Sequence, residues 1–328
     1  MRRGAITLTY LSSAASPLDR DAPFFVAGHR GMVGSAVLNC LAGNGFNNVV
    51  GRTSSELDLR DRLSVFDFFS EVRPRYVLLA AARVGGILAN DTYPADFLSD
   101  NLLIQTNVMD AANTFESERL LFLGSACIYP KYAKSPISET ALMTGYLEGT
   151  NDAYAMAKIA GIQHVKAVRK QFGRRWISAM PTNLYGPGDT YSELGSHVIP
   201  SLIMRYENAR IRGDGKVVNW GTGTPVREFL FASDLAEALL HLMEHYDDDV
   251  HVNVGSGEDV SILEVARIIA EEVGFSGQVD WDTSKPDGTP VRVLDNSLIA
   301  SLGWSPKTSL RDGIREAIDD YRERFKIS

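Results

Sequence analysis

The fold is decided by the stretch Phe24-Phe25-Val26-Ala27-Gly28-His29-Arg30-Gly31-Met32-Val33-Gly34. Its first four residues form an apolar run typical of a buried parallel strand, and residues 35–41 after it are expected to form a helix. Glycines between a strand and a helix let the backbone approach a pyrophosphate, and the helix N-terminus offers free N–H groups. The spacing is G-x-x-G-x-x-G, and a tight turn without a ligand is the alternative. We expect a dinucleotide to bind at Gly28, Arg30, Gly31, Met32, Val33 and Gly34.

The same alternation of strand and helix continues along the chain. Apolar runs and helical segments follow one another between residues 23 and 186. This order predicts an α/β fold with a Rossmann-type, doubly wound parallel sheet. The further strands are expected at residues 49–52, 76–82, 119–125 and 176–180, and the helices at residues 63–72, 94–115 and around 151–161.

The composition changes after Gly186. Loops rich in glycine and proline alternate there with short helices, and residues 251–254 form an apolar run that can return to the main sheet as a strand. We therefore expect a dinucleotide-binding domain of residues 23–186 plus 225–257. A smaller, discontinuous α/β substrate-binding domain would comprise residues 187–224 plus 258–328.

Composition and charge exclude several classes of function. The 328 residues are 45% hydrophobic and carry a net charge of −8, which argues against general affinity for nucleic acids. No apolar run approaches the ~18 residues of a membrane span. Two cysteines, Cys40 and Cys127, are too few for a disulfide framework and suit a reducing compartment such as the cytoplasm. Residues 1–22 are expected to be a disordered leader.

The end of the second expected strand indicates which dinucleotide binds. In this fold that strand end meets the adenosine ribose, where an acidic residue suits the 2′-hydroxyl of NAD and a basic residue suits the 2′-phosphate of NADP. Arg52 stands at this point and Arg30 lies in the glycine loop, so we expect NADP(H). Asp58, further along, can hydrogen-bond the adenine. An exposed surface charge is the alternative for Arg52.

Two pairs of polar residues indicate chemistry at one edge of the sheet. Ser125 and Cys127 follow the fourth expected strand, at the carboxyl edge where open α/β sheets bind their ligands. In the next helical segment, Tyr154 and Lys158 lie four residues apart and therefore on one helix face. An ammonium beside a phenol should lower the pKa of the tyrosine and make it a proton donor near neutral pH. Taken alone, the pair also fits a half-buried aromatic ring beside a solvated lysine.

One metal-binding pattern also occurs. His241-Leu242-Met243-Glu244-His245 matches the H-x-x-E-H arrangement of some metalloproteases on an expected helix. A zinc site would need a further ligand, and the two central residues are typical of a core-facing side. We therefore expect no metal site.

Several motifs together resemble the extended short-chain dehydrogenase/reductase family, and within it the enzymes that epimerise and reduce GDP-4-keto-6-deoxy sugars. The glycine loop, Ser125 and the Tyr154–Lys158 pair carry the first resemblance. The second rests on Gly-Ser-Ala-Cys-Ile-Tyr-Pro, Pro-Thr-Asn-Leu-Tyr-Gly-Pro, Ser-His-Val-Ile-Pro, Pro-Val-Arg-Glu-Phe-Leu and Ser-Lys-Pro-Asp-Gly-Thr-Pro. One departure is Ser54, where members commonly carry a second basic residue.

The resemblance implies a role for each matching residue. Ser125 and Tyr154 would hydrogen-bond a C4 carbonyl, with Tyr154 as the proton donor, and Lys158 would hold the nicotinamide ribose. Cys127 would be the base and His197 the acid of a C3/C5 epimerisation, because a ketone acidifies the neighbouring ring protons and inversion needs groups on both faces. A buried cysteine and a loop histidine are the alternative for this last pair.

The resemblance also implies contacts for both ligands. Further cofactor contacts would come from Leu59, Asn183, Leu184 and His197. The nucleotide diphosphate needs fixed cations, and it would be held by Arg205, Trp220, Arg227 and Lys285.

The implied activity is NADPH-dependent conversion of GDP-4-keto-6-deoxy-D-mannose to GDP-L-fucose, by C3/C5 epimerisation and then C4 keto reduction. One alternative is another nucleotide-sugar 4-reductase or 4-epimerase, for example on a GDP-6-deoxyheptose. Another is a non-catalytic dinucleotide-binding regulator, because a fold does not fix a function. The resemblance implies a homodimer and a GDP-sugar substrate, with neither nucleic acid nor membrane as a partner.

Overall fold

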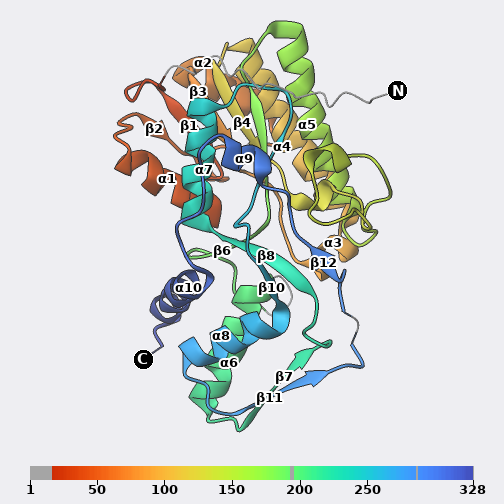
Figure 1. Ribbon diagram of the computed structural model, residues 1–328. Coiled ribbons are helices and arrows are strands. Elements are labelled where there is room, and N and C mark those ends of the chain that lie inside the picture. The colour runs from red at the N-terminus through yellow and green to blue at the C-terminus, as the bar shows by residue number, and fades with distance from the viewer. Residues whose placement is uncertain (1–16, 193–195, 286, 328) are drawn as a thin grey trace, which may run out of the picture.

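A six-stranded parallel sheet forms the upper part of the molecule (Figure 1). The computed structural model describes residues 17–192, 196–285 and 287–327. The strand order is β2-β1-β3-β4-β5-β9, and each neighbouring pair is parallel. The Rossmann-type, doubly wound prediction is therefore confirmed. The strands are β1 (Phe24–Ala27), β2 (Val49–Val50), β3 (Tyr76–Leu79), β4 (Arg119–Leu123), β5 (Ile177–Pro181) and β9 (Val252–Val254).

Helices cover both faces of this sheet, because its short strands are apolar on both sides. In β1, Phe24 and Val26 point into one core, whereas Phe25 and Ala27 point into another. The first core is closed by α1 and α7, and the second by α2, α4 and α5. These helices are α1 (Met32–Gly43), α2 (Arg62–Val72), α4 (Pro94–Thr114), α5 (Asp152–Phe172) and α7 (Ala232–His245), with short α3 (Ile87–Thr92) and α9 (Ser297–Ser301) beside them.

The lower part has its own sheets and core. In one sheet β8 (Val226–Phe231) lies between β10 (Asp259–Ser261) and β12 (Val291–Arg292), and it also pairs with β6 (Asn183–Tyr185). A second ladder joins β7 (Lys216–Trp220) to β11 (Gln278–Asp282), a strand that the sequence pattern does not predict. Three helices pack around these strands: α6 (Val198–Arg212), α8 (Ile262–Val273) and α10 (Leu310–Phe325). The two-domain division stays a prediction.

Residues 17–22 correct the expectation of a leader that extends to residue 22. Leu18 and Ala22 are buried in the same core as α7, and the Arg20 guanidinium forms an ion pair with Glu244 on that helix. The backbone N–H of Asp19 donates to the hydroxyl of Tyr76 at 2.9 Å. This segment is ordered because its two apolar side chains complete a core. Residues 1–16 lie outside the described part of the chain.

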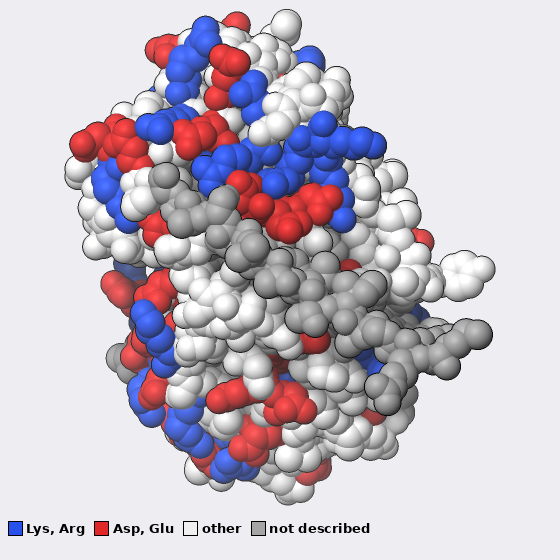
Figure 2. Space-filling model, turned by 45° about the horizontal axis from the view of Figure 1, so that its top comes forward, with Lys and Arg blue, Asp and Glu red and all other residues white. Residues whose placement is uncertain are grey.

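Charged side chains of both signs are interspersed over the face that Figure 2 shows. Many charged side chains of the described residues pair with each other, as Arg267 does with Glu264 and Glu271 on α8. Such exposed pairs contribute little to stability. Among the described residues, no helix combines the length and apolar character that crossing a bilayer requires. Most of the described arginines have such an acidic partner, so an arginine without one is unusual in this protein.

Close packing of the glycine loop on α1 gives a prediction about stability. A Cβ added at Gly34 would lie 2.0 Å from the carbonyl oxygen of Gly28, so Gly34→Ala must push the loop away from the helix. We expect this change to lower the free energy of unfolding by about 1–3 kcal/mol in urea denaturation. Gly43→Ala is the matched control on the same helix, because nothing lies within 4 Å of its added Cβ. Equal stability of the two variants would contradict this packing argument.

Candidate active site

The glycine loop lies at the point where the strand order reverses. β1 has β2 on one side and β3 on the other, and open α/β sheets bind their ligands in the crevice beside such a switch. Gly28 ends β1 with φ of 88°, in the left-handed region that favours glycine. A Cβ at Gly28 would lie 2.7 Å from the backbone nitrogen of Ala81, so only glycine fits between the two strand ends.

The surroundings of this loop fit a dinucleotide. The N–H of Gly31 donates to the carbonyl oxygen of Gly28 at 3.1 Å, and Met32, Val33 and Gly34 then form the first turn of α1. The ring of His29 packs against Gly51, which brings the loop next to the end of β2. Arg30 and Arg52 are both exposed there, and neither has an ion pair among the described residues. Free backbone donors and unpaired cations suit a pyrophosphate and a ribose phosphate.

Asp58 and Leu59 lie in the loop between β2 and α2. The Asp58 carboxylate accepts hydrogen bonds from Nε and Nη2 of Arg60 at 3.0 and 2.8 Å, and these contacts lower its pKa. Leu59 is partly buried, and its carbonyl oxygen accepts a hydrogen bond from the Asn107 amide. An adenine contact at Asp58 would share the carboxylate with Arg60, and it stays a prediction.

Four of the five predicted catalytic side chains gather at the carboxyl ends of the central strands. Ser125 follows β4 and caps a short 3-10 turn, Ala126–Ile128, which carries Cys127. The Ser125 hydroxyl oxygen accepts from the Cys127 N–H at 3.4 Å, and its side chain hydrogen-bonds both Cys127 and Tyr154. Lys158 lies one turn further along α5 with Nζ 5.7 Å from the centroid of the Tyr154 ring. The topology therefore brings together residues from two separate segments.

Burial dominates the acid–base properties of this cluster. It raises the pKa of Tyr154, and the nearby Cys127 raises it further. The expectation that Lys158 lowers this pKa is wrong in this structure, because the Lys158 ammonium donates to the carbonyl oxygen of Leu123 at 2.8 Å instead of to the phenol. Lys158 is only 3% exposed, and burial lowers its pKa to about 8. Burial also raises the pKa of the Cys127 thiol, against the effects of Ser125, Arg292 and Lys158.

His197 belongs to the lower part of the molecule. It is the residue directly before α6, its side chain is exposed, and desolvation by nearby atoms lowers its pKa. Among the described residues, no hydrogen bond or ion pair joins it to the Ser125 cluster. Asn183 and Leu184 lie on β6 at the junction of the two parts, where the Asn183 amide donates to the Glu228 carbonyl oxygen at 3.0 Å.

The predicted diphosphate residues lie around β7, β8 and the loop before β12. Arg205 on α6 donates to the side-chain oxygen of Asn219 at 3.1 Å, next to Trp220 at the end of β7. Lys285 lies over the Trp220 ring with Nζ 5.7 Å from its centroid. On β8, Arg227 donates to the carbonyl oxygen of Thr289 at 2.6 Å. Trp220 is 69% exposed, an unusual position for so large an apolar ring and one that suits stacking on a base.

A further arginine lies beside the cluster and is missed by reasoning from sequence. Arg292, on β12, donates from Nη2 to the carbonyl oxygens of Ala126 and Tyr129 at 2.8 and 3.3 Å. These two carbonyls flank Cys127. No local pattern marks Arg292, because its position depends on the pairing of β12 with β8, where Arg292 faces Arg227.

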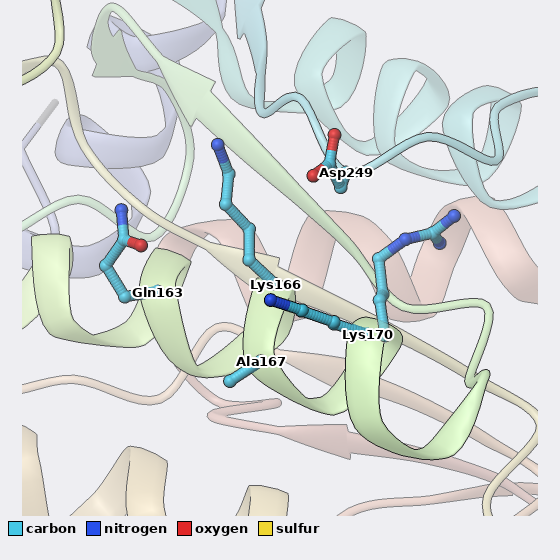
Figure 3. Close-up of a pocket in the computed structure, with 6 residues that line it drawn as sticks. Gln163, Lys166, Ala167, Lys170 and Asp249 are labelled. Carbon is cyan, nitrogen blue, oxygen red and sulfur yellow. The ribbon is translucent and has the colours of Figure 1, made fainter.

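Other candidate sites lack this chemistry. A hollow on the outer side of α5 is lined by Gln163, Lys166, Ala167, Arg169, Lys170 and Asp249 (Figure 3). It contains none of the predicted catalytic residues. In the H-x-x-E-H segment, Nε2 of His241 lies 2.9 Å from the carbonyl oxygen of Leu302. Over the described ranges, no three His, Cys, Asp or Glu side chains form a group that could hold a metal ion.

Proteins that arrange such side chains along the edge of a dinucleotide-binding sheet are NAD(P)-dependent oxidoreductases and epimerases. This chain belongs to the NAD dependent epimerase/dehydratase family, whose profile matches residues 24–255. It is 53% identical to GDP-L-fucose synthase 1 of Arabidopsis thaliana over 310 residues, which cover 94% of this chain and 96% of that protein.

Solved structures agree with this assignment. The GDP-L-fucose synthetase of Naegleria fowleri bound to NADP matches with a TM-score of 0.87 at 28% identity, covering 97% of this chain and 99% of that one. A GDP-6-OMe-4-keto-L-xylo-heptose reductase from Campylobacter jejuni matches with a TM-score of 0.88 at 33% identity. The match covers 94% of this chain and 100% of that one. The predicted family is confirmed.

The buried ammonium of Lys158 should make stability depend on pH. Its pKa is about 8 in the folded protein against an ordinary 10.5, so between these values the unfolded chain binds more protons. The free energy of unfolding therefore rises with pH over this range, by on the order of 3 kcal/mol from this group. We expect urea denaturation to show wild-type stability increasing relative to Lys158→Met from pH 8 to about 10.5. Lys170→Met, on the exposed side of the same helix, should follow the wild type at every pH.

Proposed function

We propose that this protein converts GDP-4-keto-6-deoxy-D-mannose to GDP-L-fucose with NADPH, by epimerisation at C3 and C5 and then reduction at C4. The observation that carries the proposal is the cluster of Ser125, Cys127, Tyr154 and Lys158 on adjoining elements. A reductase needs only the serine, the tyrosine and the lysine. The thiol beside them is the additional group that an epimerase requires.

The reduction is explained by the Ser125–Tyr154 pair. Both hydroxyl groups would donate to the C4 carbonyl oxygen of a bound sugar and to the alkoxide that it becomes. When bound at the glycine loop, NADPH would supply the hydride for C4. Tyr154 gives its proton to the C4 oxygen, and the ammonium of Lys158, which lies 5.7 Å from the Tyr154 ring, would hold the nicotinamide ribose. Burial raises the pKa of Tyr154 and so keeps the phenol protonated until it is needed.

The epimerisation is explained by Cys127 and His197. A thiolate at Cys127 takes the proton from C3 or C5, and the electron pair moves onto the C4 oxygen as an enolate that Ser125 and Tyr154 stabilise. His197 then returns a proton to the opposite face of the ring. His197 and Cys127 come from different parts of the molecule, which is what attack from two faces needs.

NADP(H) would be held by the glycine loop, with Arg30 and Arg52 at the ribose phosphate. The GDP group would be held by Arg205, Arg227 and Lys285, with Trp220 against an aromatic or sugar face. In support, Arg227 is partly buried without a carboxylate partner among the described residues, and burial lowers its pKa. A bound diphosphate would supply the missing negative charge.

The C. jejuni heptose reductase supports one second candidate, a C4 reductase acting on a GDP-heptose. This chain is 53% identical to the Arabidopsis GDP-L-fucose synthase 1 and 33% identical to the heptose reductase. The higher identity favours GDP-4-keto-6-deoxy-D-mannose as the substrate. A non-catalytic regulator has no use for a buried Lys158, since burial of an ammonium costs stability.

We also propose a cytoplasmic homodimer. Leu103 on α4 and Met156 on α5 are both about half exposed, and apolar side chains on neighbouring helices suit a two-fold contact. Light scattering would measure the mass of the particle directly.

The first test is product analysis by NMR. Enzyme, NADPH and GDP-4-keto-6-deoxymannose should yield GDP-L-fucose.

Tyr154→Phe should lower kcat by about 10²–10⁴, because it removes a general acid. Tyr146→Phe is a suitable control, since that ring is 94% exposed and outside the cluster. A GDP-heptose that turns over while the hexose does not would favour the second candidate.

The second test separates the two chemistries. Cys127→Ser replaces a thiol with an ordinary pKa of ~8.5 by a hydroxyl that hardly ionises near neutral pH. In D₂O without NADPH, we expect the variant to incorporate little deuterium at C3 and C5, whereas its affinity for NADPH is unchanged. His197→Asn should still allow exchange and block inversion. Exchange at wild-type rates in Cys127→Ser would falsify the assignment of the base and leave a simple reductase.

A further inference from the structure

The position of Cys127 raises an electrostatic problem. A thiol must lose its proton before it can act as a base, and burial opposes that loss. Three ionisable groups face it: Tyr154 and Lys158 from α5, and Arg292 from β12. The neutral phenol of Tyr154 carries no positive charge that could stabilise a thiolate at Cys127. The Lys158 ammonium is itself close to losing its proton near neutral pH, and it is directed to the Leu123 carbonyl.

Arg292 differs from Lys158 in both charge and attachment. A guanidinium stays protonated in proteins, so its charge is permanent. Its Nη2 donates to the carbonyl oxygens of Ala126 and Tyr129, at 2.8 and 3.3 Å, which come directly before and two residues after Cys127. The guanidinium is thereby tied to the turn that presents the thiol.

No carboxylate cancels the charge of Arg292. Among the described residues it has no ion pair, and its side chain is partly buried. Glu148, the acid whose charge affects it, is already paired with Lys131 at 3.0 Å. The neighbour across the strand pair is Arg227, a second cation. Two adjacent guanidiniums without an acidic partner lower the stability of the protein unless a bound anion offsets their charge.

We propose that Arg292 is a positioning residue for the epimerisation step, which holds the Cys127 turn and stabilises the Cys127 thiolate. The inference rests on the proposed function in one respect only, the role of Cys127 as the base. The proton leaves sulfur for solvent before substrate binds, and the thiolate later receives the proton from C3 or C5. The electron pair of that C–H bond goes to the C4 oxygen.

The first experiment titrates the thiol itself. In a Cys40→Ala background, so that Cys127 is the only thiol, alkylation by iodoacetamide is followed by mass spectrometry from pH 6 to pH 10. Arg292→Gln removes the charge and, because its side chain is shorter, also removes the contact of Nη2 with the Ala126 carbonyl oxygen. We expect it to raise the midpoint by about one pH unit and to slow alkylation about tenfold at pH 7. Arg292→Lys should stay close to the parent.

A matched control removes an arginine elsewhere. Arg315 on α10 is exposed and pairs with Glu272 and Asp312, so Arg315→Gln should leave the midpoint unchanged. An unchanged midpoint in Arg292→Gln would overturn the proposal. Circular dichroism checks that each variant is folded, and Arg292→Lys gives a second reading if Arg292→Gln is unstable.

The second experiment distinguishes thiolate stabilisation from diphosphate binding. At saturating GDP-4-keto-6-deoxymannose, deuterium exchange at C3 and C5 should slow about tenfold at pH 7 in Arg292→Gln and recover at higher pH. A raised KM with an unchanged saturated rate would instead place Arg292 in substrate binding and reject the proposal. A parent protein that shows no exchange would refute the epimerase function, while a shifted alkylation midpoint would still establish the contact between Arg292 and the thiol.

Discussion

One hydrogen bond, from the Lys158 ammonium to the Leu123 carbonyl oxygen, fixes the geometry on which the site depends. It joins the second turn of α5 to the last residue of β4, so that the helix face carrying Tyr154 stands beside the turn of Ser125 and Cys127. The helix can approach this closely because residue 161 is glycine. A Cβ there would lie 2.3 Å from the ring of Phe122 on β4. The close packing of α5 on β4 therefore also determines how Tyr154 lies relative to Ser125 and Cys127.

The site concentrates groups that the rest of the protein avoids. Elsewhere, most of the described exposed arginines pair with acids, as Arg311 does with Glu271 and Glu272, and Arg73 is an exception. Around the glycine loop and β8, the described arginines lack such partners, and at the end of β4 a buried ammonium lies near a partly exposed thiol. Each feature costs stability in the protein alone and is explained by a charged ligand or a proton transfer. Among the described arginines, the absence of an acidic partner thus points to the site, although lysines such as Lys166 and Lys170 are also unpaired elsewhere.

The sequence predicted the features that depend on local pattern. The run from Phe24 to Gly34 is enough to place a strand, a loop and a helix, and parallel topology then brings Ser125 next to Tyr154 and Lys158. What could not be predicted depends on distant pairing or on burial. Arg292 reaches the turn of Cys127 only through the register of β12 on β8. The direction of the Tyr154 pKa follows from desolvation, which a four-residue spacing does not reveal.

The register that sets Arg227 beside Arg292 has a consequence for the timing of proton transfer. The two arginines are neighbours across the strand pair, and the Arg292 guanidinium donates to the two carbonyl oxygens on either side of Cys127. Before substrate arrives, the uncancelled field favours ionisation of the thiol. When a diphosphate settles on Arg227, its negative charge offsets part of that field and makes the thiolate a stronger base. The pull of Arg292 on the thiol proton is therefore strongest in the empty site, and the basicity of the sulfur rises only once a sugar nucleotide is in place.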